Sequence, residues 1–143
     1  MPTAPVDTTA YLCTGCPLGC RLEVDAVDGD IVEIRGFDCR IGERYARQEH
    51  LDPRRPVSTT VAVDGAALPR LPVRTAEPFP RDDVAALVRS LRSVRVTAPV
   101  TRGEVVVADA LDSGIDVIAT RGMRATAAPG GRRAPQRARS SAQ

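Results

Sequence analysis

The sequence contains no tryptophan and no lysine, and it is poor in aromatic residues of every kind. Two phenylalanines, two tyrosines and one histidine occur among its 143 residues. A hydrophobic core must therefore be built mainly from Val, Leu, Ile and Ala. No stretch approaches the roughly 18 consecutive apolar residues of a membrane helix, and residues 1–12 lack the basic start and apolar run of a secretory signal. We therefore expect a soluble, cytoplasmic protein that does not enter membranes.

Motifs that would indicate an enzyme are also missing from the sequence. There is no phosphate-binding G-x-x-x-x-G-K-[ST] loop, no G-x-G-x-x-G and no H-E-x-x-H. His50 is the only histidine, so a Ser-His-Asp triad or a Cys-His dyad is restricted to one place, and we expect His50 to be a surface residue at a helix end. The chain is expected to have no independent catalytic activity.

Charge is distributed unevenly along the chain. Residues 121–143 hold six arginines and no acid, whereas residues 1–120 hold fourteen arginines and eighteen acids. The composition of residues 121–143 predicts a disordered Arg-rich tail that cannot bury enough apolar surface to fold. Such a tail can bind nucleic acid through phosphates, which gives one alternative function. We favour a solvated tail without that role, because no aromatic residue lies between the arginines to stack on bases.

The most informative motif is formed by the four cysteines, Cys13, Cys16, Cys20 and Cys39. Three of them lie within eight residues, and the fourth follows after eighteen intervening residues. In a reducing cytoplasm, closely spaced cysteines are more often metal ligands than disulfides. Four thiolates are the ligand set of both iron-sulfur clusters and structural zinc. The sequence therefore predicts a metal or cluster site near the N-terminus.

The segment between Cys20 and Cys39 is expected to form a β-hairpin. Apolar and polar residues alternate on both sides of Asp28-Gly29, which is a typical hairpin turn pair. The hairpin would return the chain to the first three cysteines, so that Cys39 completes the site. From Ile41 the period changes to that of a short helix ending near His50. Residues 1–55 are thus predicted to form a four-cysteine module.

Residues 56–120 are predicted to form a second, small α+β domain. A β-branched run at 58–63 and a return strand at 71–75 flank Asp64-Gly65, and Pro69 and Pro72 suggest that the return strand is an edge strand or irregular. Residues 81–92 have the clearest helical period in the chain. Short strands are expected at 94–96, 104–108 and 115–119. The fold class is α+β, and the pattern does not fit a Rossmann fold.

Several ordered motifs resemble one known family. The string C-T-G-C-P-L-G-C from Cys13 and the string C-R-I-G-E-R-Y-A from Cys39 are similar to an uncharacterised four-cysteine family, the domain of unknown function 1667. Later matches include Leu71-Pro72-Val73-Arg74-Thr75 and residues 116–120, so that the resemblance extends over about residues 11–120. The resemblance implies metal binding. It also implies a flavoprotein dehydrogenase or a pyridine-nucleotide oxidoreductase as partner, because such enzymes tend to be encoded beside family members.

A second resemblance is confined to the first fifty or so residues. The spacing Cys-x-x-Cys-x-x-x-Cys, followed by a hairpin and by Cys39-Arg-Ile-Gly42, is similar to the N-terminal iron-sulfur domain of molybdopterin oxidoreductases. This resemblance implies that Cys13, Cys16, Cys20 and Cys39 hold a [4Fe-4S] cluster. No molybdopterin-binding domain follows, so the chemistry of those large enzymes is not implied.

The spacing of the cysteines favours a cluster but leaves zinc open. Structural zinc usually takes two separated pairs of ligands, whereas this chain has three ligands in one loop and one farther along. Gly15 and Gly19 would let backbone amides approach the sulfurs, which tunes a cluster's potential. Our leading hypothesis is an iron-sulfur electron-transfer or accessory subunit of a flavin-dependent oxidoreductase. The alternative is a protein-interaction module held together by Zn²⁺.

Overall fold

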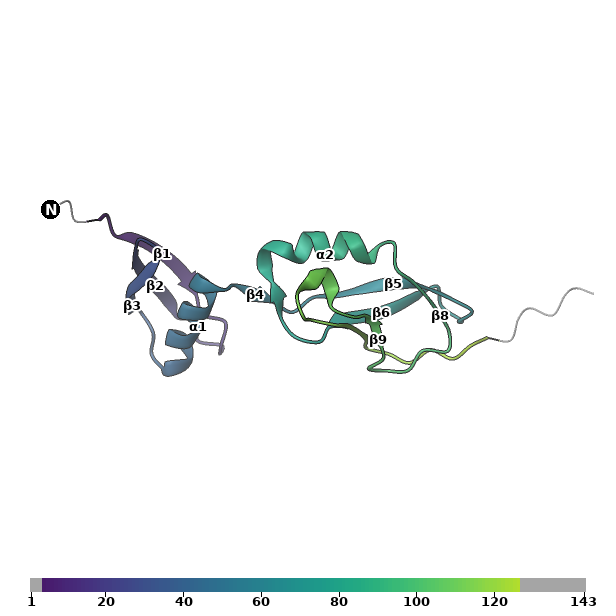
Figure 1. Ribbon diagram of the computed structural model, residues 1–143. Helices are drawn as coiled ribbons and strands as arrows, with labels where there is room; N and C mark the ends of the chain where they lie inside the picture. The colour runs from purple at the N-terminus through teal and green to yellow at the C-terminus, as the bar shows by residue number, and fades with distance from the viewer. Residues whose placement is uncertain (1–3, 127–143) are drawn as a thin grey trace, which may run out of the picture.

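The computed structural model describes residues 4–126 and has an α+β fold with two hydrophobic cores. One core lies between residues 13 and 46, and the other between residues 57 and 123. Figure 1 shows the two corresponding units side by side, joined through the segment that contains strand β4. The predicted fold class is therefore confirmed.

The N-terminal unit is a three-stranded antiparallel sheet followed by one helix. The strands are β1 (Asp7–Leu12), β2 (Arg21–Val27) and β3 (Asp30–Arg35), in that order across the sheet, and the helix is α1 (Arg40–Leu51). The predicted hairpin is confirmed as β2 and β3. Asp28 and Gly29 have φ values of 52° and 90°, and two consecutive positive φ values match the twist of a tight hairpin. The predicted helix from Ile41 to near His50 is confirmed as α1. Strand β1 is an addition to what the sequence pattern predicted.

Helix α1 packs on this sheet through its smallest residues. Ala46 is fully buried, and a Cβ atom on Gly42 would lie 3.7 Å from Leu22 Cδ2 and 3.0 Å from Phe37 Cβ. The buried cluster contains Cys13, Leu22, Val24 and Ala46. This core is small, so the unit has little apolar burial to offset its loss of chain entropy.

The connection between the units pairs with the second unit. Strand β4 (Arg54–Arg55) forms a two-stranded antiparallel pair with β7 (Phe79–Pro80), and Arg81 donates a backbone hydrogen bond of 2.9 Å to the carbonyl of Pro53. Residues 53–55, which we assigned to the first module, are therefore tied to the second unit by backbone hydrogen bonds.

The second unit contains a mixed five-stranded sheet in the order β8-β5-β6-β10-β9. Its strands are β5 (Ser58–Asp64), β6 (Arg70–Thr75), β8 (Arg95–Thr97), β9 (Val105–Val107) and β10 (Val117–Ala119). Its helical segments are η1 (Arg81–Asp83), α2 (Val84–Leu91) and η2 (Ala110–Asp112). Among the described strands, only β5 and β8 pair in parallel, and α2 lies between β6 and β8 in the chain. The predicted hairpin, helix and three short strands are confirmed.

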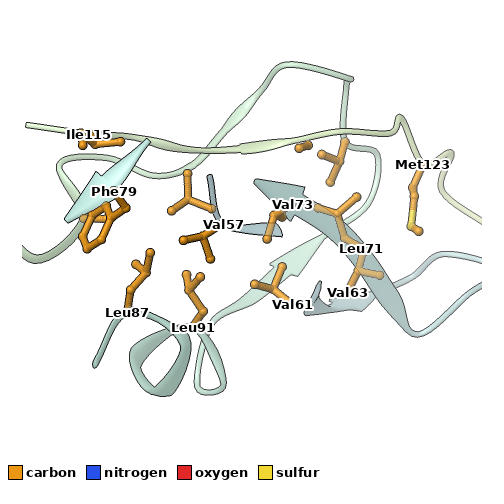
Figure 2. Close-up of a cluster of buried hydrophobic side chains, with 14 of the residues drawn as sticks. Val57, Val61, Val63, Leu71, Val73, Phe79, Leu87, Leu91, Ile115 and Met123 are labelled. Atoms are coloured by element: carbon orange, nitrogen blue, oxygen red, sulfur yellow. The ribbon is translucent and has the colours of Figure 1, made fainter. Parts of the chain in front are cut away.

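The core of the second unit fills the space between the sheet and helix α2. Figure 2 shows Leu87 and Leu91 of α2 pointing toward Val57 and Phe79, and all four side chains are buried. The helix therefore covers the sheet with the apolar face that its period predicted.

The prediction that β6 is an edge strand or irregular is wrong. Strand β6 is central, because it pairs with β5 on one side and with β10 on the other. Pro72 is tolerated there because the β10 pairing ends beside it: its carbonyl accepts hydrogen bonds from the backbone N–H (3.0 Å) and hydroxyl (3.1 Å) of Thr120. The hydrogen bond that a proline cannot make is the reciprocal one, from position 72 to the carbonyl of Thr120, so the loss falls on the last pair of this ladder.

The predicted start of the tail at residue 121 is too early. Met123 is buried in the second core and exchanges two backbone hydrogen bonds of 2.8 and 2.9 Å with Val100. Thr126 donates its backbone N–H to the carbonyl of Gly65 at 2.7 Å. Residues 121–126 thus belong to the second unit. The rest of the predicted Arg-rich tail, 127–143, and four of its six arginines lie outside the described residues.

We expect Met123→Ala to lower the free energy of unfolding of the second unit by about 2 kcal/mol, near the low end for a buried methionine, because the residue lies near the end of the folded chain. The matched control is Leu68→Ala, since Leu68 is an exposed apolar residue of the same unit. Urea unfolding followed by circular dichroism would measure both. Equal stabilities of the two variants would contradict the assignment of Met123 to the core.

Among residues 4–126, no helix has the length and apolar character required to cross a membrane.

Candidate metal centre

The first three cysteines lie in one loop between β1 and β2. The two strands end side by side, with Leu12 paired to Arg21, and the backbone N–H of Cys13 then donates to the carbonyl of Cys20 at 2.8 Å. This hydrogen bond closes an eight-residue loop whose first and last residues are Cys13 and Cys20. Cys16 lies within it. We refer to residues 13–20 as the cysteine loop.

Two glycines determine how the cysteine loop lies. The backbone N–H of Gly15 points at the Sγ of Cys13, 3.4 Å away, and Gly19 has a φ of +62°, in the left-handed region that favours glycine. A Cβ atom on Gly15 would lie 2.6 Å from Ile41 Cγ2. The loop therefore packs against the first turn of α1, and a side chain at position 15 would push the two apart.

The fourth cysteine is placed next to the loop by the turn after β3. Cys39 is the N-cap of α1, with extended backbone, and its carbonyl accepts a hydrogen bond of 3.0 Å from the N–H of Gly42. The preceding residue reaches the loop directly, because Asp38 Oδ2 lies 3.8 Å from Cys20 Sγ. A helix N-terminus favours nearby negative charge, so this position suits an anionic thiolate ligand.

The four cysteines are thus at one end of the N-terminal unit, as the hairpin argument predicted, and all four are free thiols. Cys13 is buried, Cys16 and Cys20 are half-buried, and Cys39 is exposed. Their side chains do not converge: within residues 4–126, no three His, Cys, Asp or Glu side chains are arranged as a metal-ligand set. The chemistry of the donors and their shared location fit a thiolate-bound metal or cluster, and the assignment of Cys13, Cys16, Cys20 and Cys39 as ligands stays a prediction.

An ionic network fixes the sheet that carries the loop. Arg35 on β3 forms ion pairs with Asp25, with Glu33 at 2.8 Å and with Glu23 at 3.1 Å, and Thr8 on β1 donates to Asp25 at 2.7 Å. The Arg35 guanidinium, and secondarily the Thr8 hydroxyl, hold the pKa of Asp25 below its usual value. This network was not predicted from the sequence. The signal was available, because strand alternation places Glu23 directly opposite Arg35 in the hairpin.

A second polar cluster lies at the other end of α1, near the connection to the second unit. His50 Nδ1 is 2.9 Å from the hydroxyl of Tyr11, so the only histidine is half-buried against β1 and is not a plain surface residue. Glu49 is buried and forms a bidentate ion pair with Arg55, at 2.5 and 2.8 Å. The Arg55 guanidinium holds the pKa of Glu49 below its usual value, although burial opposes this shift.

The pKa of Glu49 gives stability a defined pH dependence. A carboxyl group whose pKa is lower in the folded than in the unfolded chain stabilises the fold at a pH above its unfolded pKa of about 4.3. This contribution is lost as the pH falls through the lower pKa of the folded state. We expect Glu49→Gln to cost about 1 kcal/mol at pH 7, because Arg55 is still 41% exposed to screening by solvent. The cost should fall toward zero at pH 3.

Urea midpoints at pH 7 and pH 3 measure this effect. Glu77→Gln is the matched control, since Glu77 is exposed and should follow the wild type at both values. A Glu49→Gln deficit that is equal at pH 7 and pH 3 would show that the ion pair does not provide the stability.

Comparisons with known proteins identify the family. Residues 40–121, more than half of the chain, match the model of a family described as "Protein of unknown function (DUF1667)". The match begins directly after Cys39, so all four cysteines lie outside it, and the predicted extent from residue 11 is not shown. The chain is also similar to the NMR structure of Clostridium perfringens protein CPE0013, with 18% identity, a TM-score of 0.48, and coverage of 57% of this chain and 96% of that chain. No curated protein matches. The chain therefore belongs to the DUF1667 family of proteins of unknown function.

Proposed function

We propose that Cys13, Cys16, Cys20 and Cys39 hold a [4Fe-4S] cluster, and that the protein is an electron-transfer or accessory subunit of a flavin-dependent oxidoreductase in the cytoplasm. The observation that carries this proposal is the closure of the cysteine loop by the 2.8 Å hydrogen bond from Cys13 to Cys20, next to the turn that delivers Cys39. Three ligands in one closed loop and one from an adjacent turn suit the corners of a cubane better than two separated zinc knuckles.

The loop also offers what a cluster requires of its surroundings. The Gly15 N–H already points at the Cys13 sulfur, and amide hydrogen bonds to sulfur are one of the means by which proteins set a cluster's reduction potential. The similarity of the cysteine spacing to the iron-sulfur domain of molybdopterin oxidoreductases supports the same ligand set. When bound, such a cluster supplies one-electron transfer. The chain's own residues hold it at an exposed end, where Cys39 is accessible and a partner can approach.

The proposed role as a subunit rests on the side chains that lie near the cysteine loop. Leu12 and Ile41 contact the cysteine loop among the described residues, and the carboxylate that the structure places against the loop is that of Asp38. A centre that accepts and donates single electrons needs another protein to carry out the chemistry on a substrate. A flavoprotein is the partner of choice, because flavins convert between one- and two-electron steps.

One observation favours the second candidate, a structural Zn²⁺. Only five apolar residues of the described part of the N-terminal unit are buried, namely Cys13, Leu22, Val24, Ala26 and Ala46. Domains of about 50 residues with so little core are often stabilised by a metal, and zinc would supply that stability without redox chemistry. In this alternative the N-terminal unit is a protein-interaction module.

Redox spectroscopy separates the two candidates. We expect the anaerobically purified protein to absorb broadly in the visible range, to bleach on addition of dithionite, and to recover when oxidised FMN is added. A protein with bound zinc that shows no visible absorption before or after dithionite would contradict the electron-transfer proposal. For that form, a chelator should unfold the N-terminal unit, which Tyr11 and Tyr45 report because both tyrosines of the chain lie there.

A further inference from the structure

Large apolar side chains surround the cysteine loop and are open to solvent. Leu12 is 62% exposed, Leu18 76%, Phe37 39% and Ile41 46%. Isolated exposed apolar residues are common on protein surfaces, but a group of them in one place indicates an interaction site. Leu18 belongs to the cysteine loop and Leu12 directly precedes it, whereas Phe37 and Ile41 lie on either side of Cys39 in the sequence.

Leu18 belongs to the cysteine loop, Leu12 and Ile41 contact the loop, and Phe37 lies against the first turn of α1. Leu12 Cδ1 is 4.0 Å from the position of a Cβ on Gly19, next to Leu18, and Ile41 Cγ2 is 2.6 Å from the corresponding position on Gly15. Phe37 Cβ is 3.0 Å from the position that a Cβ atom on Gly42 would take, and Gly42 is the residue after Ile41. We call residues 12–21 and 37–47 together the cysteine face.

Arginines lie at the edge of the cysteine face. Arg40, Arg44 and Arg47 recur along α1 at helical spacing, are exposed, and line one surface depression together with Glu43. The contact between Arg47 and Glu43 is long, at 4.0 Å. The cysteine face carries four arginines and two acids, whereas residues 1–120 as a whole carry fourteen arginines and eighteen acids. The face is therefore a positive surface on an otherwise acidic body.

We propose that the cysteine face is the docking surface for an acidic electron-transfer protein, which would place its own apolar contact residues over Leu12, Leu18 and Ile41 and its acidic residues against the arginines. Transient redox complexes bury little area, and complementary charge at the edge of the contact increases their rate of association. An apolar centre with a charged edge is also the usual composition of a protein interface. A protein partner fits better than nucleic acid, because aliphatic side chains dominate the centre and do not stack on bases as aromatic rings do.

The redox nature of the partner depends on the proposed function, but the docking surface does not. Its test therefore uses a probe that needs no cluster: a fluorescent peptide of repeated Glu-Glu-Leu, titrated with the full-length protein and followed by anisotropy. We expect saturable binding that weakens as salt is added, and weaker binding of a Glu-Glu-Ser peptide that lacks the apolar residues. The double variant Arg40→Glu/Arg44→Glu and the single variant Leu18→Asp should each weaken binding about 10-fold.

Arg89→Glu is the matched control, because Arg89 is an exposed arginine on α2 in the second unit, and it should bind like the wild type. Equal affinity of all variants would overturn the proposal. Tighter binding of an oligothymidine that the same variants weaken would also overturn it, because this result assigns the face to nucleic acid. A dimer in sedimentation that Leu18→Asp converts to monomer would overturn it too, because this result assigns the face to a second copy.

Metal analysis of the same samples keeps the two proposals apart. Iron-free protein with variant-sensitive peptide binding rejects only the cluster, whereas iron-loaded protein with variant-insensitive binding rejects only the docking surface.

Discussion

Cys16→Ser is expected to reduce the iron bound to the protein at least about 10-fold and to abolish the visible absorption, because a serine hydroxyl is a poor replacement for a thiolate ligand. Cys16 is the suitable position, since it is half-buried within the cysteine loop, whereas Cys13 belongs to the small core and its replacement would also disturb packing. Iron and sulfide assays on anaerobically purified protein measure the effect.

Thr14→Ser is the matched control for this variant. Thr14 is an exposed residue of the same loop, so its replacement tests whether any change in the loop causes the loss. It should keep the iron and the absorption of the wild type. Full iron and sulfide content in Cys16→Ser would show that Cys16 is not a ligand. The cysteine loop would then supply two ligands, and the preference for a cluster over zinc would lose its support.

The second large effect is expected at Gly36, at the end of β3. Its φ is +83°, and a Cβ atom there would lie 2.1 Å from the carbonyl oxygen of Arg21. Backbone cannot move aside as a flexible side chain can, so Gly36→Ala must shift the turn that leads to Cys39. We expect a loss of about 3 kcal/mol or more in the stability of the N-terminal unit, from left-handed strain and the clash together.

Gly29→Ala provides the control for Gly36→Ala. Gly29 has a similar φ of +90°, but nothing lies within 4 Å of the position of its Cβ. This variant should lose only the cost of left-handed backbone, about 1 kcal/mol. Tyrosine fluorescence during urea unfolding would compare the two at matched metal content, since both tyrosines lie in this unit. Equal losses would show that the close approach of Gly36 to Arg21 is not a constraint.

Local patterns in the sequence were sufficient for most of the elements. The pair Asp28-Gly29 predicted the β2–β3 hairpin because both residues adopt positive φ readily, and the period of residues 81–92 predicted α2 because one face is apolar. Strand β1 was missed because its partner lies across the cysteine loop, and no turn signal of that kind joins the two strands.

The errors arose where distant contacts decide the structure. Pro72 looked like a residue of an edge strand, but whether its missing N–H matters depends on where β10 ends, which no local pattern reveals. Met123 lies in a segment whose composition resembles a tail, and its burial depends on pairing with Val100. Arginine-rich composition alone does not show that a segment is unfolded.

The candidate site was predictable in composition but not in geometry. The spacing of the cysteines and the predicted hairpin between Cys20 and Cys39 indicated that Cys39 lies near the loop. The contact of Asp38 with Cys20 and the packing of Gly15 against Ile41 depend on the turn after β3, because that turn sets where α1 begins. The exposed apolar residues of the cysteine face likewise became significant only when the fold placed them around one loop.

Binding of a [4Fe-4S] cluster by the four cysteines is tested most directly by measuring iron, acid-labile sulfide and zinc in the full-length protein purified under anaerobic conditions. We expect about four irons and four sulfides per chain, with little zinc. One zinc per chain with no iron and no sulfide would contradict it.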